Sequence, residues 1–336
     1  MKVAVIGCGI MGRTHANAYN QLQDAELVGV CDFVEEVARK EADTFNTTPY
    51  FSFEEMIKEA KPEVVSICLP THLHKEYVMK AADLGVHVVC EKPIAPTLEE
   101  AREMISYCEA KGVRLFVAHV VRFFPSYKNI SNKVKDGAVG SVGVIHTKRI
   151  GSHPGATKPW YKDVSKSGGV IMDLMIHDLD YVRSIAGDVK TVYAIGRTTD
   201  EIDYALVTLR FENGAIANLE AFWGYPGAFT TAVEVSGNKG VIRFNSADAA
   251  TVKVRKAADP ATGADAIAKD MSPHLHNPYY YELEHFLNCI ATGQASDVTA
   301  EDGYEAVKLS LAALESLRTG KAVSMNGFEA SEGRSN

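Results

Sequence analysis

The stretch of sequence that decides the fold is Val3–Gly12, which reads VAVIGCGIMG. Its first residues are apolar and predict a buried strand, and the remainder matches the pattern G-x-G-x-x-G that opens a helix in dinucleotide-binding folds. The first glycine permits a tight turn, the second lets the backbone approach a pyrophosphate, and the third lets the helix pack on the strand. Because phosphates bind at the N-terminus of such a helix, the sequence predicts cofactor contacts at Gly7, Gly9, Ile10, Met11 and Gly12.

The first third of the chain continues as an alternation of strands and helices. Further strand-like runs, each followed by a helical pattern or a turn, lie at residues 27–31, 64–69, 86–90 and 115–118. Alternation of this kind predicts a doubly wound parallel sheet. The runs are almost entirely apolar, as expected for strands that helices cover on both faces.

After about residue 120, β-rich runs and hairpin-like turns replace this alternation. The runs lie at residues 191–196, 204–211, 215–222, 231–236, 241–245 and 251–254. They predict an open, mostly antiparallel sheet, and two helices are expected to follow it near 279–290 and 301–317. The expected architecture is therefore α/β followed by α+β, with domains at 1–120 and 121–328 and a frayed tail at 329–336.

Composition and sheet type limit the partners that the chain can have. The net charge is −8 and basic residues form no long run, which argues against nucleic acid as a partner. No apolar run approaches the ~18 residues of a membrane helix, and the N-terminal residues predict a strand and a turn rather than an export signal. The cysteines include no C-x-x-C pair, so a reducing cytoplasm is expected. An open sheet must cover its second face, which predicts a homo-oligomer, a dimer or tetramer.

Asp32 indicates which dinucleotide is bound. It ends the second strand, 20 residues after Gly12, where a carboxylate accepts hydrogen bonds from a ribose 2′-hydroxyl and repels a 2′-phosphate. No arginine occurs at residues 33–38 to hold such a phosphate. The sequence therefore predicts NAD in preference to NADP, with a glycine-rich turn that binds no ligand as the alternative.

Two further motifs carry ionisable side chains. Glu91-Lys92-Pro93 follows a buried strand, at the edge where parallel sheets bind ligands, although a lone lysine there is often only solvated. Helical spacing over residues 168–186 puts Asp173, His177 and Asp180 on one face, a stripe that is also typical of an ordinary amphipathic helix.

These motifs suit the oxidation of an alcohol. A histidine with an ordinary pKa of ~6.5 can take the hydroxyl proton, so His177 is the candidate base. Asp173 is expected to orient the imidazole or bind a substrate hydroxyl, and Lys92 to polarise the reacting oxygen or to share the proton transfer. His153 and Trp160, in the loop before the helix, are weaker candidates for substrate contacts, with ordinary packing as the alternative.

In combination, the motifs resemble the glucose-fructose oxidoreductase, inositol dehydrogenase and MocA-type (Gfo/Idh/MocA) family over nearly the whole chain. The resemblance rests on the glycine loop, Glu91-Lys92-Pro93, Asp173-x-x-x-His177, Arg122-Phe123 with Pro125, and Tyr281-Glu282. The chain departs from the family at Thr71 and Val120, where asparagine is frequent. The resemblance implies a Rossmann domain, a cis Lys92–Pro93 bond, catalytic roles for Lys92, Asp173 and His177, and substrate contacts at Arg122 and Tyr281. It also implies cofactor contacts at Leu69, Pro70, Thr71, His74, Glu91 and Lys92.

The resemblance implies hydride transfer between NAD and a secondary alcohol of a cyclic polyol, a sugar or a sugar derivative. Alternatives within the family are an NAD-dependent glycosidase, a non-catalytic sensor of sugar or NAD, and dihydrodiol or biliverdin reductase-like chemistry. A metal site could be imagined from Asp173, His177 and Asp180 with His-x-His pairs at 72–74 or 274–276. No metal is expected, because no established metal-binding spacing occurs and hydride transfer to NAD needs none.

Overall fold

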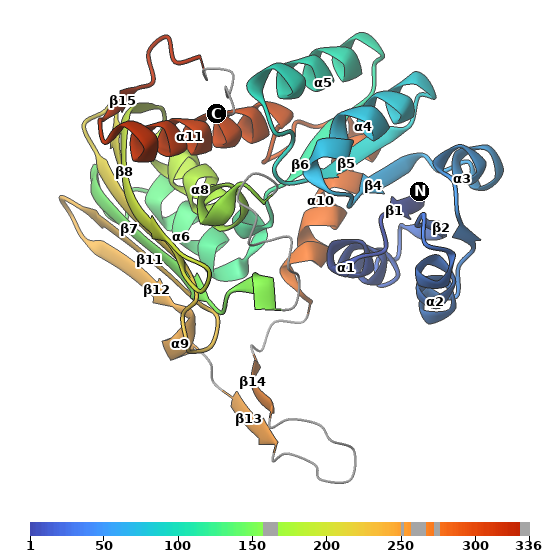
Figure 1. The fold of residues 1–336 in the computed structure, drawn as a ribbon, viewed down its shortest axis with the longest axis horizontal. Coiled ribbons are helices and arrows are strands. Elements are labelled where there is room, and N and C mark those ends of the chain that lie inside the picture. Colours follow the sequence, from blue (N-terminus) through green and yellow to red (C-terminus); the bar gives the residue numbers. More distant parts are fainter. Residues whose placement is uncertain (157–166, 250–251, 257–266, 272–275, 330–336) are drawn as a thin grey trace.

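A six-stranded parallel sheet has the order β3-β2-β1-β4-β5-β6 (Figure 1). Its strands are β1 (Lys2–Ile6), β2 (Glu26–Cys31), β3 (Pro49–Tyr50), β4 (Val64–Ile67), β5 (His87–Glu91) and β6 (Leu115–Ala118). The structure is a computed structural model that describes residues 1–156, 167–249, 252–256, 267–271 and 276–329. Strands β2 and β4 flank β1, so the strand order reverses there, and ligands bind beside the carboxyl ends of strands at such a switch.

Helices cover both faces of this sheet, which confirms the doubly wound architecture. Helices α1 (Ile10–Tyr19), α2 (Glu35–Phe45) and α10 (Pro278–Thr292) pack on the face that contains Val3 and Val5. Helices α3 (Phe53–Ala60), α4 (His74–Asp83) and α5 (Leu98–Ala110) pack on the face that contains Ala4 and Ile6. The sequence analysis missed β3, because two residues are too few to show a periodic pattern.

A seven-stranded sheet follows, in the order β12-β11-β7-β10-β9-β8-β15. Its strands are β7 (Val142–Gly151), β8 (Val189–Thr198), β9 (Asp203–Phe211), β10 (Ile216–Trp223), β11 (Thr230–Gly237), β12 (Val241–Asn245) and β15 (Val323–Ser324). Its pairings are antiparallel except for β7 with β10, which confirms a mostly antiparallel sheet. Strand β7 was not predicted, since its polar residues obscure the alternation.

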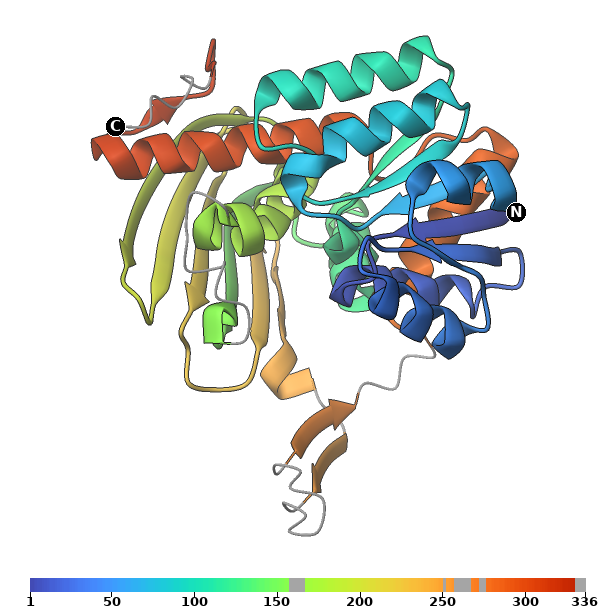
Figure 2. The same cartoon turned by 45° about the vertical axis from the view of Figure 1, so that its right-hand side comes forward.

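One face of the second sheet packs on helices and the other is open (Figure 2). The helical side holds α6 (Pro125–Lys135), a π-helical turn η5 (Ile171–Met175) and α8 (Ile176–Ala186). The open side carries large apolar side chains that are 40–58% exposed, namely Tyr193, Ile195, Ile216 and Val241.

The last long helix, α11 (Ala300–Thr319), packs on both sheets. Its Ala306 and Val307 belong to the core of the first sheet, and its Leu309 and Ala312 belong to the core of the second. The helix begins at a capping box, in which the Thr299 hydroxyl accepts from the Asp302 backbone N–H and the Asp302 carboxylate accepts from the Thr299 N–H. The domain boundary placed at residue 120 stays a prediction, because chain from beyond it completes the first core.

Short elements complete the described chain. They are the 3₁₀ turns η1 (Thr71–Leu73), η2 (Val120–Phe123) and η3 (Pro154–Ala156), helix α9 (Ser246–Ala249), and strands β13 (Val252–Lys256) and β14 (Ile267–Met271). The run predicted at 251–254 does not join the large sheet, because β13 pairs with β14 in a separate hairpin that projects from the body (Figures 1 and 2). The tail predicted at 329–336 lies outside the described residues except for Glu329.

Candidate active site

The glycine loop has the form that a dinucleotide requires. Gly7 has a φ of +86°, and a Cβ there would lie 2.6 Å from the Cys68 carbonyl oxygen. A Cβ on Gly12 would lie 1.7 Å from the Gly7 carbonyl oxygen, so helix packing requires this glycine. At Gly9, in contrast, a Cβ would meet no heavy atom of the described chain within 4 Å. Protein packing therefore does not require Gly9, and the open space above it is where a pyrophosphate would approach the backbone.

Asp32 lies directly beside this loop. One carboxylate oxygen accepts a hydrogen bond from Cys8 N–H at 2.8 Å, and the other accepts from Val34 N–H at 2.9 Å. Each carboxylate oxygen has a second lone pair, so the group can still accept from ribose hydroxyls. Helix α1 has no side-chain cap and no acidic residue in its first turn, which leaves its positive end available to a phosphate. The loop and Asp32 therefore fit NAD.

His74 ties together two segments near the cofactor loop. It is fully buried, with Nδ1 2.9 Å from the Pro93 carbonyl oxygen and Nε2 2.9 Å from the Leu69 carbonyl oxygen. Burial lowers the pKa of His74, whereas the carbonyl oxygens that face both ring nitrogens favour the protonated ring. His74 thus holds the Leu69–Thr71 segment against the Lys92–Pro93 bond, which is cis as expected. Cofactor contacts at Leu69, Pro70, Thr71 and His74 stay predictions.

Lys92 and Asp173 meet between the two sheets. Lys92 Nζ donates to the Asp173 backbone carbonyl oxygen at 2.6 Å and to Asp173 Oδ1 at 3.0 Å. The side chains are 15% and 21% exposed, so the pair is sheltered yet reachable. Asp173 belongs to the π-helical turn η5 rather than to a regular helix. Turns of this type interrupt the i→i−4 ladder and occur frequently at functional sites.

His177 follows on the first turn of α8. Its Nδ1 is buried without a hydrogen-bond partner in the described part of the chain. Burial, with the nearby charges of Lys92 and Arg149, holds the pKa of His177 well below its ordinary value. The imidazole is therefore neutral at neutral pH and can accept a proton. No hydrogen bond joins Asp173 to His177 among the described residues, so Asp173 holds Lys92 rather than the imidazole.

Asp180 and Arg122 belong to a separate cluster of paired charged side chains. The Arg122 guanidinium donates through Nε to Asp180 Oδ2 at 2.7 Å and through Nη2 to Asp180 Oδ1. Arg122 also forms an ion pair with Asp302 at 3.2 Å. Asp180 is 1% exposed, so the polar stripe expected from regular helical spacing does not continue as far as this residue. The substrate contact expected at Arg122 stays a prediction, and both ends of its guanidinium are already occupied.

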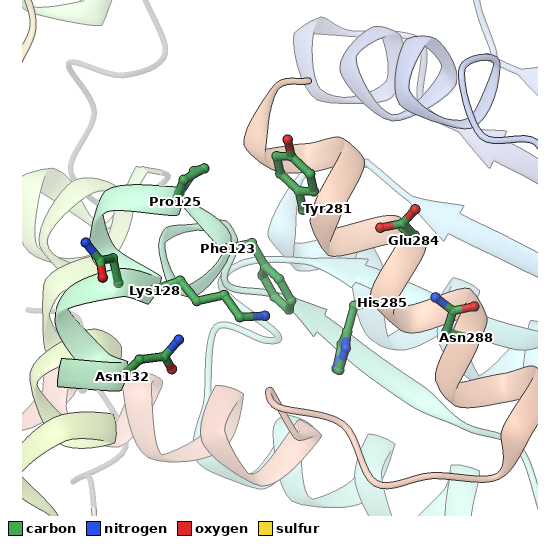
Figure 3. Close-up of a pocket in the computed structure, with 9 residues that line it drawn as sticks. Phe123, Pro125, Lys128, Asn132, Tyr281, Glu284, His285 and Asn288 are labelled. Carbon is green, nitrogen blue, oxygen red and sulfur yellow. The ribbon is translucent and has the colours of Figure 1, made fainter. Parts of the chain in front are cut away.

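Tyr281 lies on α10. With Phe123, Lys128 and His285 it lines a polar hollow of about 520 Å³ between α6 and α10 (Figure 3). Its predicted substrate contact stays a prediction. His153 Nδ1 accepts from Gly155 N–H at 2.9 Å within its own loop, and Trp160 lies outside the described residues.

Sequence reasoning missed Tyr279 and His15. The two rings pack with centroids 6.2 Å apart. Burial and the charges of Glu91 and Glu282 raise the pKa of Tyr279. His15 in turn lies 3.1 Å from Glu91, the residue before Lys92. The helical period could have placed Tyr279 on the buried face of its helix, because it precedes the buried residues Glu282 and Leu283 by three and four positions.

No group of three or more His, Cys, Asp or Glu side chains among the described residues is arranged to hold a metal ion. Among the described helices, none is both long enough and apolar enough to cross a membrane.

Family models match both parts of the chain. Residues 1–119 match the oxidoreductase family with an NAD-binding Rossmann fold, and residues 132–325 match the C-terminal alpha/beta domain of the same oxidoreductase family. The chain belongs to the Gfo/Idh/MocA family. This member is thus an oxidoreductase whose cofactor is NAD.

Individual relatives span all or most of the chain. Myo-inositol 2-dehydrogenase of Thermotoga maritima is 29% identical over 97% of this chain and 98% of its own length. 2,7-Anhydro-N-acetylneuraminate hydratase of Escherichia coli is 32% identical over 73% of this chain and 68% of its own length. A solved structure of a probable dehydrogenase from Thermotoga maritima has a TM-score of 0.85 at 26% identity and covers 97% of this chain and 99% of that one.

Proposed function

We propose that this oxidoreductase transfers hydride between NAD and a secondary alcohol of a cyclic polyol, a sugar or a sugar derivative. The observation that carries the proposal is the contact between Lys92 Nζ and Asp173, beside a neutral His177. This contact lies at the carboxyl end of β5, where a parallel sheet binds its ligand. The full-length similarity to an inositol dehydrogenase supports the substrate class.

Each residue has a separate task in this proposal. Bound NAD supplies the hydride acceptor. The Lys92 ammonium donates a hydrogen bond to the substrate oxygen and stabilises the negative charge that develops there as the hydroxyl proton departs. An unprotonated nitrogen of His177 takes that proton. Asp173 keeps the ammonium in position and accepts a hydrogen bond from a neighbouring hydroxyl of the substrate.

A substrate screen with the purified protein tests the proposal. NADH absorbance is followed with NAD and a panel of inositols, hexoses, sugar acids and amino sugars. We expect at least one cyclic polyol or sugar to give NADH with saturation kinetics. Reaction only with simple aliphatic alcohols would contradict the substrate class.

A second candidate is a reaction without net oxidation, and the similarity to a hydratase of a sugar derivative favours it. In this class, the hydride removed from the sugar is returned before the product leaves. The NAD-dependent glycosidase considered from the sequence belongs to the same class. It would release product from a glycoside or an anhydro sugar while NADH absorbance stays flat, so product analysis by mass spectrometry distinguishes the two candidates.

We also propose that a second copy of the chain covers the open face of the seven-stranded sheet. Tyr193 and Ile195 of β8, with Ile216 and Val241, form an apolar surface that is costly to leave in water. Light scattering at micromolar concentration should show a dimer or a tetramer. Ile195→Lys should shift the protein toward monomer, and a wild-type monomer would contradict the proposal.

A further inference from the structure

A hydrogen-bonded network of buried polar side chains leads to the backbone of Lys92. Tyr19 OH is 2.8 Å from Ser66 Oγ, and Ser66 Oγ is 3.1 Å from His15 Nδ1. His15 Nε2 is 3.1 Å from Glu91 Oε1, and Glu91 Oε2 accepts the Lys92 backbone N–H at 3.1 Å. Tyr19, Ser66 and His15 are 0% exposed and Glu91 is 5% exposed. None of these groups is needed to explain proton or hydride transfer.

This hydrogen-bonded network connects helix α1, which follows the cofactor loop, to Lys92. His15 lies on α1, one turn after Gly12, and Glu91 is the last residue of β5, next to Lys92. These residues are 76 positions apart in the sequence. A buried polar group costs free energy unless it is paired, and a fully paired network restricts its members to one arrangement. The arrangement of α1 is thus tied to the backbone of Lys92.

The carboxyl groups of Glu91 and Glu282 differ in how readily they ionise. Burial opposes ionisation of Glu91, but the hydrogen bond with His15 and the charge of Lys92 hold its pKa below the usual value. The neighbouring carboxyl of Glu282 is fully buried and has no hydrogen-bond partner in the part of the chain described. Burial and the nearby charges of Glu91 and Asp180 raise the pKa of Glu282 well above its usual range. At neutral pH, Glu91 is therefore the anion.

We infer that His15 is a positioning residue, which fixes Lys92 through Glu91 and couples the NAD-binding helix α1 to the catalytic lysine. The inference rests on the proposed function only in assigning Lys92 a catalytic role; the connection between His15 and Lys92 stands on the contacts themselves.

Two variants of His15 test its contacts with Glu91 and with Ser66 separately. In His15→Gln the side-chain amide reaches the place of Nε2, so it can still donate to Glu91. In His15→Asn the shorter amide reaches the place of Nδ1, so it keeps Ser66 and loses Glu91. Both variants remove the ring from the core, so a purely structural role predicts similar effects for the two.

The first readout is the rate at which Lys92 is acetylated by an N-hydroxysuccinimide ester, measured by mass spectrometry relative to exposed Lys111. We expect Lys92 to react faster in His15→Asn by on the order of fivefold, the effect of losing one buried hydrogen bond. His15→Gln should stay close to wild type. Equal rates in all three proteins, or an equal rise in both variants, would overturn the inference.

Ser66→Ala provides a second variant if His15→Asn does not fold. It leaves the bond between His15 and Glu91 but removes the hydroxyl that holds the other ring nitrogen. A smaller rise in Lys92 acetylation is expected, and an unchanged rate would overturn the inference. Because acetylation needs no substrate, it tests the position of Lys92 even if the proposed reaction is wrong.

A kinetic readout follows once the screen has identified a substrate. A displaced Lys92 slows the chemical step, so His15→Asn should lower kcat and increase the primary deuterium isotope effect, with NAD affinity retained. A variant that merely contains less folded protein shows the wild-type isotope effect. Lower kcat with an unchanged isotope effect would therefore contradict a positioning role.

Discussion

Lys92 Nζ lies 2.6 Å from the backbone carbonyl oxygen of Asp173 and 3.0 Å from its carboxylate. Lys92 directly follows strand β5 of the first sheet, and Asp173 lies in a π-helical turn beneath the second. The ammonium is therefore held by two acceptors from a different part of the chain before any substrate arrives. Preorganisation of this kind avoids reorganisation during the reaction.

Lys92→Ala should lower kcat/KM by on the order of 10²–10³-fold, because the charge that stabilises the developing alkoxide is lost. NAD affinity, measured by calorimetry, should be retained, since the glycine loop and Asp32 are unchanged. The matched control is Lys111→Ala, which removes an exposed lysine that pairs with Asp83. Near wild-type turnover in Lys92→Ala would refute the catalytic role.

The pH dependence should reflect the neutral state of His177. Burial and the nearby cations place its pKa well below the ordinary 6.5, so the base stays available as the pH falls through that value. We expect kcat/KM to stay constant down to pH 6.5 and to decline only in more acidic solution. A decline of kcat/KM in acid with its midpoint at or above pH 6.5 would contradict this assignment.

The lowered pKa of His177 also makes the stability depend on pH, in the same direction. The unfolded chain binds a proton at this histidine as the pH falls through its ordinary 6.5, whereas the folded protein does not. The stabilising contribution of the neutral His177 is therefore complete above 6.5 and is lost as the pH falls below it. The Tm should therefore decrease on acidification from 6.5. Rates must be normalised to folded protein at each pH, and a Tm that rises on acidification would contradict the prediction.

Two glycines of the cofactor loop should respond differently to alanine. At Gly9 the added Cβ meets no described atom within 4 Å, so Gly9→Ala should keep its Tm while NAD binding weakens by on the order of tenfold or more, since the methyl group occupies the pyrophosphate's place. At Gly12 the Cβ would lie 1.7 Å from a carbonyl oxygen, so Gly12→Ala should lower the Tm. Thermal scanning and calorimetry separate the effects, and equal loss of Tm in both would contradict the open cradle at Gly9.

Asp32 should determine the preference for NAD. Wild type should favour NAD over NADP by on the order of 10²-fold in kcat/KM, because the carboxylate repels a 2′-phosphate. Asp32→Asn removes the charge but keeps one acceptor oxygen for the backbone N–H groups. It should therefore reduce the ratio of kcat/KM with NAD to kcat/KM with NADP. A wild-type preference for NADP would overturn the role of Asp32.

Local patterns were enough to predict the first sheet, except for its two-residue edge strand β3, and the cofactor loop. The apolar run Val3–Ile6, the spacing of the glycines and the carboxylate at Asp32 are all visible within a few residues of one another. The same is true of the helices that close the chain, which begin and end within two residues of their predicted positions.

Features that depend on distant residues were missed. Arg149 interrupts the apolar pattern of β7, yet it is buried because Asp178, 29 positions away, pairs with it at 2.8 Å. The π-helical turn at Asp173 has no local sequence signature, so a regular helix was expected there. The connection from His15 to Glu91 exists only because the parallel sheet brings α1 and β5 together.

Helix α11 has a consequence for how the protein unfolds and how it can be divided. A fragment that ends at residue 120 would lack α10 and α11, and so would expose the apolar surfaces of the NAD-binding half that Phe286 and Val307 cover. Heat should melt the two halves in a single cooperative transition. The halves of this enzyme are therefore not interchangeable modules, and a chimaera that exchanges the C-terminal half must keep the surfaces of α10 and α11 that fit the NAD-binding half.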